Sequence, residues 1–526
     1  MNDQELKAPP DSAAANQQFR SQVGHISRQS GVFFAGTIFT AGLAYLFKVY
    51  LARVLGAEYL GLYALGMTLI GFIGIFNTMG LPQSAVRFVA AYHAAGKFKE
   101  LHALVWGGAG MLLAANAVLA VVLLPFGRLV AARVYHSPAL VPYLPLFAMI
   151  LLFGVVNTFY GRVLAGYRDL KLRTLIVNFI GSPLTMLLGV LLISAGMRLR
   201  GYLIAQILSA VLVGLLLLLA VRRFTPRAAQ LWAQSSLYPR KEVWSFSAAM
   251  LGINLLEFIM SQVDKIALGY YRSAREVGIY SVAAALVVYV PLVLSSVNQI
   301  FAPTIADLHT RGEFGLLARL FQSLTKWIIG LTLPLALVII VFARPLMRIF
   351  GHDFEGGWPI LVIGTFGQLV NCGVGSVGYL LLMSGNQNRL MRVQAAMAVV
   401  MVALSAALIP RWGVVGAAVA AAATTVGVNV WNLLEVRAAL ALSPYNRGYF
   451  RLLWPAAVTL ALMLGLSRYS HIFHHDWLAV GTALALAYTL FAGIVLLTGL
   501  DSDDRMIATA IWSRVRGSFR GRGAEA

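Results

Sequence analysis

Long runs of apolar residues with almost no charge recur along this sequence. The runs from Leu203 to Val221 and from Leu478 to Leu500 are each roughly 20 residues long, the length at which a helix crosses ~30 Å of hydrocarbon. Of the 526 residues, 59% are hydrophobic and only 12% are charged, whereas about 25% are charged in a typical soluble domain. Because such a chain cannot hide its apolar surface in water, the runs predict membrane-spanning segments.

These segments are expected to be helices. The interior of a bilayer offers no partner to a free backbone group, so a spanning segment is either a helix or a strand of a closed barrel. The runs lack the alternation of polar and apolar residues that barrel strands show. The sequence therefore predicts an all-α integral membrane protein, with about fourteen helices near residues 31–54, 60–86, 102–125, 140–163, 172–195, 199–221, 243–268, 278–303, 318–343, 357–384, 389–409, 413–436, 450–467 and 478–499.

Lys and Arg concentrate in alternate loops of this helix pattern. One such loop contains Arg222, Arg223, Arg227, Arg240 and Lys241, and the loops on either side of it hold fewer basic residues. Because an excess of Lys and Arg marks the cytoplasmic loops, we expect a multi-pass protein of the cytoplasmic (inner) membrane with both termini in the cytoplasm. The formal net charge of +21 then belongs to these loops, and no nucleic-acid partner is predicted.

The sequence also contains an internal repeat. Gly61-Leu62-Tyr63 is matched 217 positions later by Gly278-Ile279-Tyr280, and residues 90–98 are matched by residues 306–314 at an offset of 216. A weaker match pairs residues 163–166 and Arg173 with residues 382–385 and Arg392 at an offset of 219.

Each repeat spans six predicted helices, so both halves enter the membrane in the same sense. Transporters with such parallel repeats place substrate near the interface of the halves, which rock against each other. The predicted organisation is an N-terminal cytoplasmic tail (1–30), a first six-helix bundle (31–225), a cytoplasmic linker (226–242), a second six-helix bundle (243–436), an extra helix pair (450–499) and a basic cytoplasmic tail (501–526).

Ionisable residues within the predicted helices are few, and each is a functional candidate. Lys48 and Lys265 are 217 positions apart, so they occupy equivalent places in the two repeats. With Arg87, they are candidate contacts for an anionic substrate inside the membrane. The alternative is that both lysines extend to the lipid head groups.

Two acids on the seventh predicted helix are candidates for coupling transport to a cation. Glu257 and Asp264 are seven residues apart, which places them two turns apart on the same helix face. Such a line of acids could bind Na⁺ or H⁺. The alternatives are a structural ion pair with a neighbouring helix and a buried, protonated glutamate.

The sequence favours neither an enzyme nor a cofactor-binding protein, and we expect no catalytic residue. It contains no GxxxxGK[ST] loop and no loop long enough to form a catalytic domain. The only cysteine, Cys372, lies in an apolar segment and is expected to be a buried packing residue. His471, His474, His475 and Asp476 are expected to form a solvated loop and not a metal site.

Three segments resemble the polysaccharide transporter family of oligosaccharide flippases. They are Arg53-Val54-Leu55-Gly56-Ala57-Glu58-Tyr59-Leu60-Gly61-Leu62-Tyr63, Gly80-Leu81-Pro82-Gln83-Ser84-Ala85-Val86-Arg87 and Val263-Asp264-Lys265-Ile266-Ala267-Leu268-Gly269. The family belongs to the superfamily that also contains lipid II flippases and multidrug and toxin extrusion antiporters. The resemblance implies two pseudo-symmetric six-helix bundles in a V shape around a central cavity.

The resemblance also implies a cargo, a polyprenyl-pyrophosphate-linked oligosaccharide, which is moved across the membrane by alternating access. The expected partners are this lipid-linked oligosaccharide, membrane lipid and possibly other membrane proteins of polysaccharide assembly. Two alternatives stay open. One is a cation-coupled multidrug or metabolite antiporter of the same superfamily, and the other is a non-transporting membrane component of polysaccharide synthesis.

Overall fold

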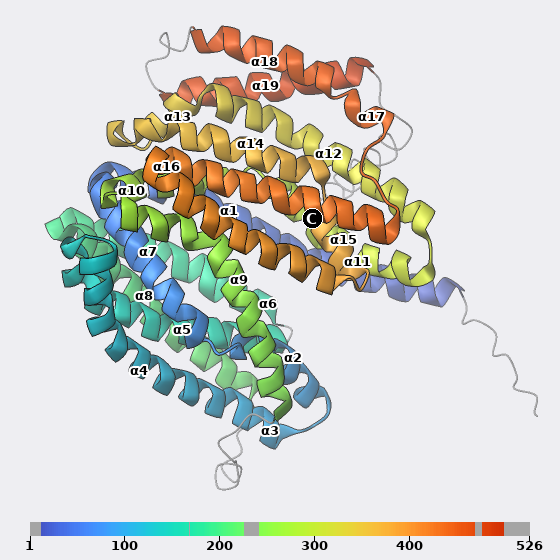
Figure 1. Ribbon diagram of the computed structural model, residues 1–526. Helices are drawn as coiled ribbons and strands as arrows, with labels where there is room; N and C mark the ends of the chain where they lie inside the picture. Colours follow the sequence, from blue (N-terminus) through green and yellow to red (C-terminus); the bar gives the residue numbers. More distant parts are fainter. Residues whose placement is uncertain (1–11, 168, 226–240, 469–475, 499–526) are drawn as a thin grey trace, which may run out of the picture. The chain divides into compact units, whose positions relative to one another are not determined.

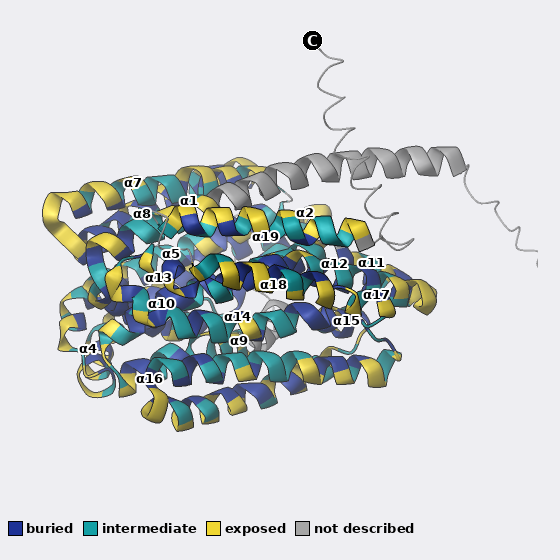
Figure 2. Cartoon of the chain, turned by 90° about the horizontal axis from the view of Figure 1, so that it is seen from above, coloured by how far each residue is buried: buried dark blue, intermediate teal, exposed yellow. Residues whose placement is uncertain are grey.

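The computed structural model describes residues 12–167, 169–225, 241–468 and 476–498 as helices joined by short turns (Figure 1). No strand occurs within these ranges, which confirms the predicted all-α class. Large apolar side chains face outward on many helices, for example Val121 (69% exposed), Val399 (70%) and Leu497 (89%). Figure 2 shows exposed residues in yellow along the outer edge of α16 (Gln387–Leu440). Such surfaces are stable only in contact with lipid, so the chain is a multi-pass membrane protein.

The helices pack into two compact units. The first comprises Met1–Val54, Leu69–Ala131 and Pro138–Leu255. Its core joins α2, α5 and α8 through side chains such as Val89, Phe159 and Leu217. Its helices are most of α1 (Ser12–Asn77), α2 (Leu81–Ala94), α3 (Phe98–His102), α4 (Gly108–Leu129), α5 (Leu144–Gly166), α6 (Leu170–Thr174), α7 (Ser182–Leu192), α8 (Arg198–Phe224) and the start of α9 (Lys241–Tyr271).

The second unit comprises Leu55–Thr68, Ala132–Ser137 and Leu256–Ala526. Phe321 and Leu380 lie in its largest core, and α18 and α19 lie side by side along α12 and α13 (Figure 1). Beyond α9 its helices are α10 (Ala274–Val287), α11 (Leu292–Arg311), α12 (Phe314–Val341), α13 (Ala343–Arg348), α14 (Trp358–Val374), α15 (Val377–Met383), α16, α17 (Arg447–Phe450), α18 (Leu453–Arg468) and α19 (Asp476–Thr498).

Two helical stretches are each long enough for two membrane passes. Lys171–Phe224 and Gln387–Leu440 are 54 residues long, which is ~80 Å of straight helix and more than twice the thickness of the hydrocarbon. Each is interrupted by a residue with positive φ, Gly196 and Gly413 respectively. Nine helices in the described part of the chain qualify as spans, or ten if the bent α10–α11 pair counts as one. The number of crossings, fourteen, and the bundle boundaries stay predictions.

Three helices expected to be continuous are broken. The segment predicted at 60–86 is interrupted before Leu81 because Gly80 is left-handed (φ 70°). The segment at 278–303 bends by 50° between α10 and α11, where Pro291 precedes α11 and has no N–H to continue the helix. The segment at 357–384 is interrupted at Gly375 (φ 72°).

The terminal and linker segments differ in how far the structure describes them. The N-terminal segment expected as a tail is helical from Ser12. Most of the predicted linker, the basic C-terminal tail and His471, His474 and His475 lie outside the described residues.

Turns at equivalent positions confirm the internal repeat. α2 and α11 both end in a left-handed glycine, Gly96 (φ 66°) and Gly312 (φ 73°). In each turn the next residue donates a backbone hydrogen bond across the end of the helix. Lys97 N donates to Tyr92 O (2.9 Å), and Glu313 N donates to Leu308 O (3.0 Å). A histidine and a phenylalanine also pack edge to face in both turns, His93 with Phe98 and His309 with Phe314.

The third repeat match has a different register from the one predicted. After α5, Asp169 N donates to Leu164 O (3.1 Å), and after α15, Asn386 N donates to Leu381 O (2.9 Å). These two bonds are 217 positions apart, so the offset of 219 was wrong. The Leu-Ala-Gly and Met-Ser-Gly triplets were aligned by composition, whereas the turn geometry aligns Asp169 with Asn386, the residues that precede α6 and α16.

Segments of the two sequence repeats touch at a pair of equivalent glycines, Gly61 and Gly278. Both glycines belong to the second compact unit. A Cβ atom on Gly61 would lie 1.6 Å from the carbonyl oxygen of Ala274, and one on Gly278 would lie 1.9 Å from the carbonyl oxygen of Ala57. Ala57 and Gly61 are 217 positions before Ala274 and Gly278, so the contact is symmetric. Small residues four apart allow helix backbones to approach this closely. We call these four residues the glycine contact.

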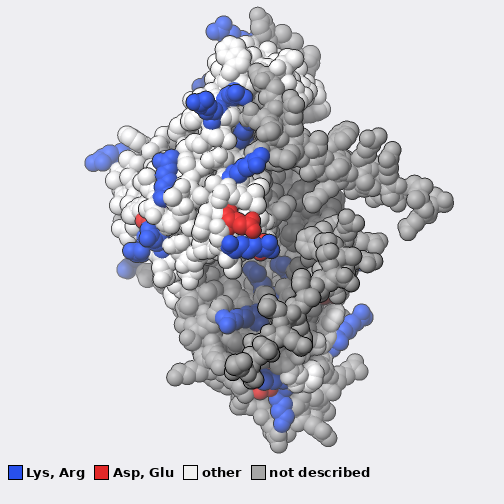
Figure 3. All heavy atoms as spheres, turned by 90° about the vertical axis from the view of Figure 1, so that its right-hand side faces the viewer, with Lys and Arg blue, Asp and Glu red and all other residues white. Residues whose placement is uncertain are grey.

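Ion pairs at the helix ends connect loops that the distribution of Lys and Arg assigns to the same side of the membrane. Arg275 pairs with Asp353 (2.8 Å) and Arg348 with Asp476 (2.8 Å), all in the loops poorer in basic residues. Arg389 pairs with Glu435 (2.9 Å) at segments assigned to the richer loops. On the face seen in Figure 3, Lys and Arg outnumber Asp and Glu among the described residues. Which side faces the cytoplasm stays a prediction.

The glycine contact predicts that Gly61→Val destabilises the protein. The added side chain meets a backbone carbonyl that cannot rotate away, so the helices must separate at a cost of about 1–3 kcal/mol. The midpoint of thermal unfolding in detergent measures this effect. Gly110→Ala is the control, because Gly110 is helical with no atom within 4 Å of an added Cβ. Equal midpoints for both variants would contradict the close approach.

A second prediction concerns the break before α8. Arg198 has φ 47° and ψ −132°, close to the φ 55° and ψ −130° of Gly413 at the corresponding break of the second repeat. Because a side chain in this region is strained by roughly 1–3 kcal/mol, Arg198→Gly should be more stable than Arg198→Ala by about 1 kcal/mol. Both variants lose the arginine side chain, so they differ only at the backbone. If the alanine variant is at least as stable as the glycine variant in thermal unfolding, the backbone at this position is unstrained.

Candidate functional site

Asp264 and Lys265 sit next to each other on α9 but have different partners. Asp264 is buried (7% exposed), and one carboxylate oxygen accepts a hydrogen bond from the Tyr280 hydroxyl of α10 (2.5 Å). Lys265 is half-buried, and its Nζ donates to Gln262 Oε1 one turn earlier (2.8 Å). In the part of the chain that the structure describes, Lys265 forms no ion pair. The amide occupies one of its three N–H donors, so two stay available for an anion.

The same region of the first repeat keeps the lysine but not the acid. At an offset of 217, Lys48 corresponds to Lys265 and Tyr63 to Tyr280, whereas Phe47 stands in the place of Asp264. Lys48 is half-buried on α1. It belongs to the first unit and Lys265 to the second, so a shared anion site between them stays a prediction.

The other two candidates are exposed. Arg87 lies on the outside of α2, with its guanidinium carbon 5.4 Å from the centre of the Phe88 ring. Glu257 is exposed on α9, seven residues before the buried Asp264. The two acids therefore differ in environment, and their role as an ion-coupling pair stays a prediction. Among the described residues Asp264 forms no ion pair with a neighbouring helix, because its partner on α10 is the uncharged Tyr280 hydroxyl, which the sequence did not reveal.

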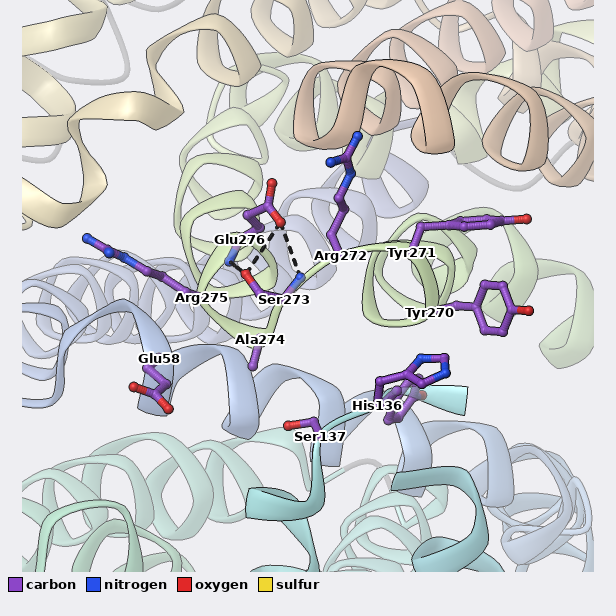
Figure 4. Close-up of a pocket in the computed structure, with 11 residues that line it drawn as sticks. Glu58, His136, Ser137, Tyr270, Tyr271, Arg272, Ser273, Ala274, Arg275 and Glu276 are labelled. Carbon is purple, nitrogen blue, oxygen red and sulfur yellow. Dashed lines mark hydrogen bonds between the residues drawn. The ribbon is translucent and has the colours of Figure 1, made fainter. Parts of the chain in front are cut away.

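A polar cavity of about 580 Å³ lies near the end of α9, entirely within the second unit. Three segments far apart in the sequence form its wall. They are Glu58 of α1, the loop Tyr135–Ser137, and Tyr270–Glu276, which includes the end of α9 and the start of α10. Figure 4 shows Glu58, His136 and Ser137 on one side of the cavity and Tyr270 and Ala274 on the other. The sequence analysis did not find this site, because none of the segments carries a recognisable binding motif.

The start of α10 fixes the second wall of the cavity. Ser273 and Glu276 form a reciprocal capping pair, in which Ser273 N donates to Glu276 Oε2 (3.2 Å) and Glu276 N donates to Ser273 Oγ (3.3 Å). Figure 4 shows these bonds as dashed lines. Arg275 is held by Asp353, and Arg272 Nη2 donates to Pro410 O (3.1 Å). The S-x-x-E spacing was the one signal in the sequence that could have located this wall.

The opposite wall contains Tyr135 and His136. Tyr135 is only 4% exposed, and burial raises the pKa of its phenol, which therefore stays protonated at neutral pH. His136 has a left-handed backbone (φ 46°), and its ring centre is 5.8 Å from that of Tyr270. A non-glycine residue in this region is strained and persists only where the surrounding structure holds it.

In the described residues, no three His, Cys, Asp or Glu side chains come together as metal ligands. Asp476, which the sequence analysis grouped with three histidines, pairs with Arg348 (2.8 Å). Cys372 is buried as predicted.

The chain is similar to known membrane proteins. The fold resembles the lipid II flippase MurJ in an inward closed conformation, with 13% identity, a TM-score of 0.66 and coverage of 88% of this chain and 98% of that one. It also resembles an inward-facing multidrug resistance MATE family transporter of the MOP superfamily, with 15% identity, a TM-score of 0.59 and coverage of 76% and 94%. A MOP superfamily transporter from Pyrococcus furiosus gives 15% identity, a TM-score of 0.55 and coverage of 79% and 95%.

No individually curated protein sequence matches the chain. At the family level, residues 249–410 match the MatE family. Residues 26–309, more than half of the 526 residues, match the family described as polysaccharide biosynthesis protein. The chain therefore belongs to the polysaccharide biosynthesis protein family, with a fold shared by MurJ and MATE transporters.

Proposed function

We propose that the protein moves a polyprenyl-pyrophosphate-linked oligosaccharide across the cytoplasmic membrane. Family membership supports a role in polysaccharide formation, and the fold is one that a lipid II flippase uses. The observation that carries the proposal is the state of Lys265, a half-buried membrane lysine whose ammonium group donates to a neutral amide, whereas the adjacent acid accepts from the Tyr280 hydroxyl and the Lys265 backbone N–H. A pyrophosphate that leaves water needs such cationic donors to offset its lost hydration.

The proposed cargo contacts are Lys265, Lys48 and Arg87. The first two occupy equivalent places in the repeats, so a cavity shared by the two halves would present one ammonium group from each. A lysine binds phosphate as a single point charge and lacks the two-point grip of arginine, which suits a transporter that must also release its cargo. The chemistry is translocation, with no catalytic residue or cofactor proposed.

The transport cycle would require the glycine contact to open. Ala57 and Gly61 belong to the first repeat and Ala274 and Gly278 to the second, and their backbones touch. In alternating access the two repeats separate at one side while they close at the other. The contact is therefore the closed side of this state. The loops next to the glycine contact are the ones poorer in Lys and Arg, so we propose that the contact faces away from the cytoplasm. Both termini would then lie in the cytoplasm.

A cation-coupled antiporter of the same superfamily is the second candidate. The match of residues 249–410 to the MatE family favours it, as does a buried acid, Asp264, on a membrane helix. An antiporter for cationic compounds would be expected to use such acids to bind its cargo, whereas Lys48 and Lys265 favour an anionic one. In the flippase, Asp264 and Glu257 are proposed as sites for a driving cation.

The lysine proposal predicts slower transport by Lys265→Ala and Lys48→Ala. Each loses one charge-assisted hydrogen bond to pyrophosphate, which contributes about 1.5–3 kcal/mol, or roughly 10–100-fold in affinity. The rate is measured with a fluorescent polyprenyl-pyrophosphate oligosaccharide in vesicles at subsaturating concentration. Lys97→Ala, which removes an exposed lysine from the turn after α2, is the control. Wild-type rates in both lysine variants would exclude this site while leaving the flippase proposal intact.

The ion-coupling proposal predicts that Asp264→Asn transports its cargo but no longer responds to an imposed Na⁺ or H⁺ gradient. The amide keeps the shape of the side chain and can still accept the Tyr280 hydrogen, whereas it cannot exchange a cation. Glu257→Gln tests the second acid in the same way. Asp307→Asn, at an exposed acid paired with Arg311 (3.0 Å), is the control. If the Asp264 and Glu257 variants respond to both gradients as the wild type does, these acids are not the sites that couple transport to a cation.

A further inference from the structure

We propose that the cavity beside Tyr270–Glu276 is a binding site for the hydroxylated rings of a sugar chain, separate from the lysines proposed to hold pyrophosphate. Its volume of about 580 Å³ falls within the ~300–1,000 Å³ typical of small-ligand sites, which leaves room for two or three sugar rings. The assignment of this sugar to the transported cargo rests on the proposed function, whereas the site itself does not.

Aromatic rings give the cavity apolar surfaces of the size of a sugar ring. Tyr270 and Tyr271 are 47% and 41% exposed, with ring centres 4.7 Å apart and planes at 85°. His136 adds a third ring that lies next to Tyr270, with the two ring centres 5.8 Å apart (Figure 4). Exposed tyrosines beside polar groups are typical of binding surfaces, because each ring offers an apolar face and a polar tip. The apolar C–H face of a sugar can stack on such rings.

Unused hydrogen-bonding groups also line the cavity. Within the described residues, neither the Glu58 carboxylate nor the Tyr135 hydroxyl has a hydrogen-bond partner. Because a polar group in a mostly buried side chain is stabilised by a hydrogen-bond partner, the Tyr135 phenol is available to a ligand. Glu58 can only accept, and the protonated Tyr135 can donate. A sugar hydroxyl both donates and accepts and so can satisfy each of them.

The two arginines of the cavity differ in how they are bonded. Arg275 is paired with Asp353, whereas Arg272 donates from Nη2 to the neutral Pro410 O, and its buried Nε has no hydrogen-bond partner among the described residues. The carboxylate of Glu58 has no cationic partner among the described residues and would repel a phosphate group. The anionic and the neutral parts of a lipid-linked oligosaccharide would therefore be bound at different places.

The two places lie at a suitable spacing along one helix. Lys265 precedes Tyr270 by five residues on α9, which is about 8 Å of helix rise. A pyrophosphate at Lys265 would thus have its first sugars at the level of the cavity. Glu58 and Tyr271 come from different repeats, so a bound sugar would bridge the two sides of the glycine contact.

Saturation-transfer NMR on the purified full chain in detergent tests the site with three free neutral trisaccharides: cellotriose, maltotriose and N,N′,N″-triacetylchitotriose. We expect saturation transfer to at least one of them and a Kd about tenfold weaker in Tyr271→Ala, the factor that corresponds to ~1.4 kcal/mol. Glu58→Gln and Tyr135→Phe should each weaken binding severalfold. Tyr379→Ala, which removes a comparably exposed tyrosine of α15 (39% exposed), should bind as the wild type.

Three results would overturn the proposal. The first is the absence of saturation transfer to all three trisaccharides. The second is equal binding by the wild type and a folded Tyr271→Ala variant, as judged by its thermal midpoint. Displacement of the bound sugar by inorganic pyrophosphate would also contradict it, because the cavity would then be an anion site.

Transport by Tyr271→Ala identifies the source of the sugar. If the variant loses trisaccharide binding and also moves the lipid-linked oligosaccharide more slowly, the cavity serves the head group of the cargo. If binding is lost and transport is unchanged, the cavity binds a free sugar chain, which also supports the site. Sugar binding by a wild-type protein that moves no lipid-linked oligosaccharide would contradict the proposed function and leave the site intact.

Discussion

The contact between two pairs of small residues, Ala57 with Gly61 and Ala274 with Gly278, positions the other features of the candidate site. Their backbones approach so closely that a Cβ on either glycine would overlap a carbonyl group. Ala274, on one side of this contact, also lines the polar cavity. Two residues after Gly278, Tyr280 reaches Asp264 on α9. One backbone approach thus fixes both the wall of the cavity and the environment of the buried acid.

The membrane helices and the duplication were predictable because both are periodic properties of the chain. Apolar runs reveal spans, and the offset of 217 identified Gly61 with Gly278 before their contact was known. The breaks at Gly375 and before Leu292 were missed, because a glycine or proline in an apolar run ends a helix only where tertiary packing accepts the bend. The cavity was missed for a related reason, since Glu58, His136 and Tyr271 come from three distant segments with no shared motif.

The chemistry near the end of α9 matches the two parts of the proposed cargo. Lys265 offers N–H donors to an anion, and the cavity beyond Tyr270 offers rings, a carboxylate and a phenol to neutral hydroxyl groups. Asp264 accepts hydrogen bonds from the Tyr280 hydroxyl and from the backbone N–H of Lys265, and within the described residues it forms no ion pair with the Lys265 ammonium group. A lipid-linked oligosaccharide has both an anionic and a neutral part, whereas a cationic drug has neither.

The most direct test of this account compares two cargoes in the same vesicles, reconstituted with the wild-type protein. One is a fluorescent polyprenyl-pyrophosphate trisaccharide and the other is a cationic dye of the kind that multidrug transporters export. The account predicts protein-dependent movement of the sugar lipid between leaflets and no protein-dependent movement of the dye. Movement of the dye alone would contradict it and establish the antiporter.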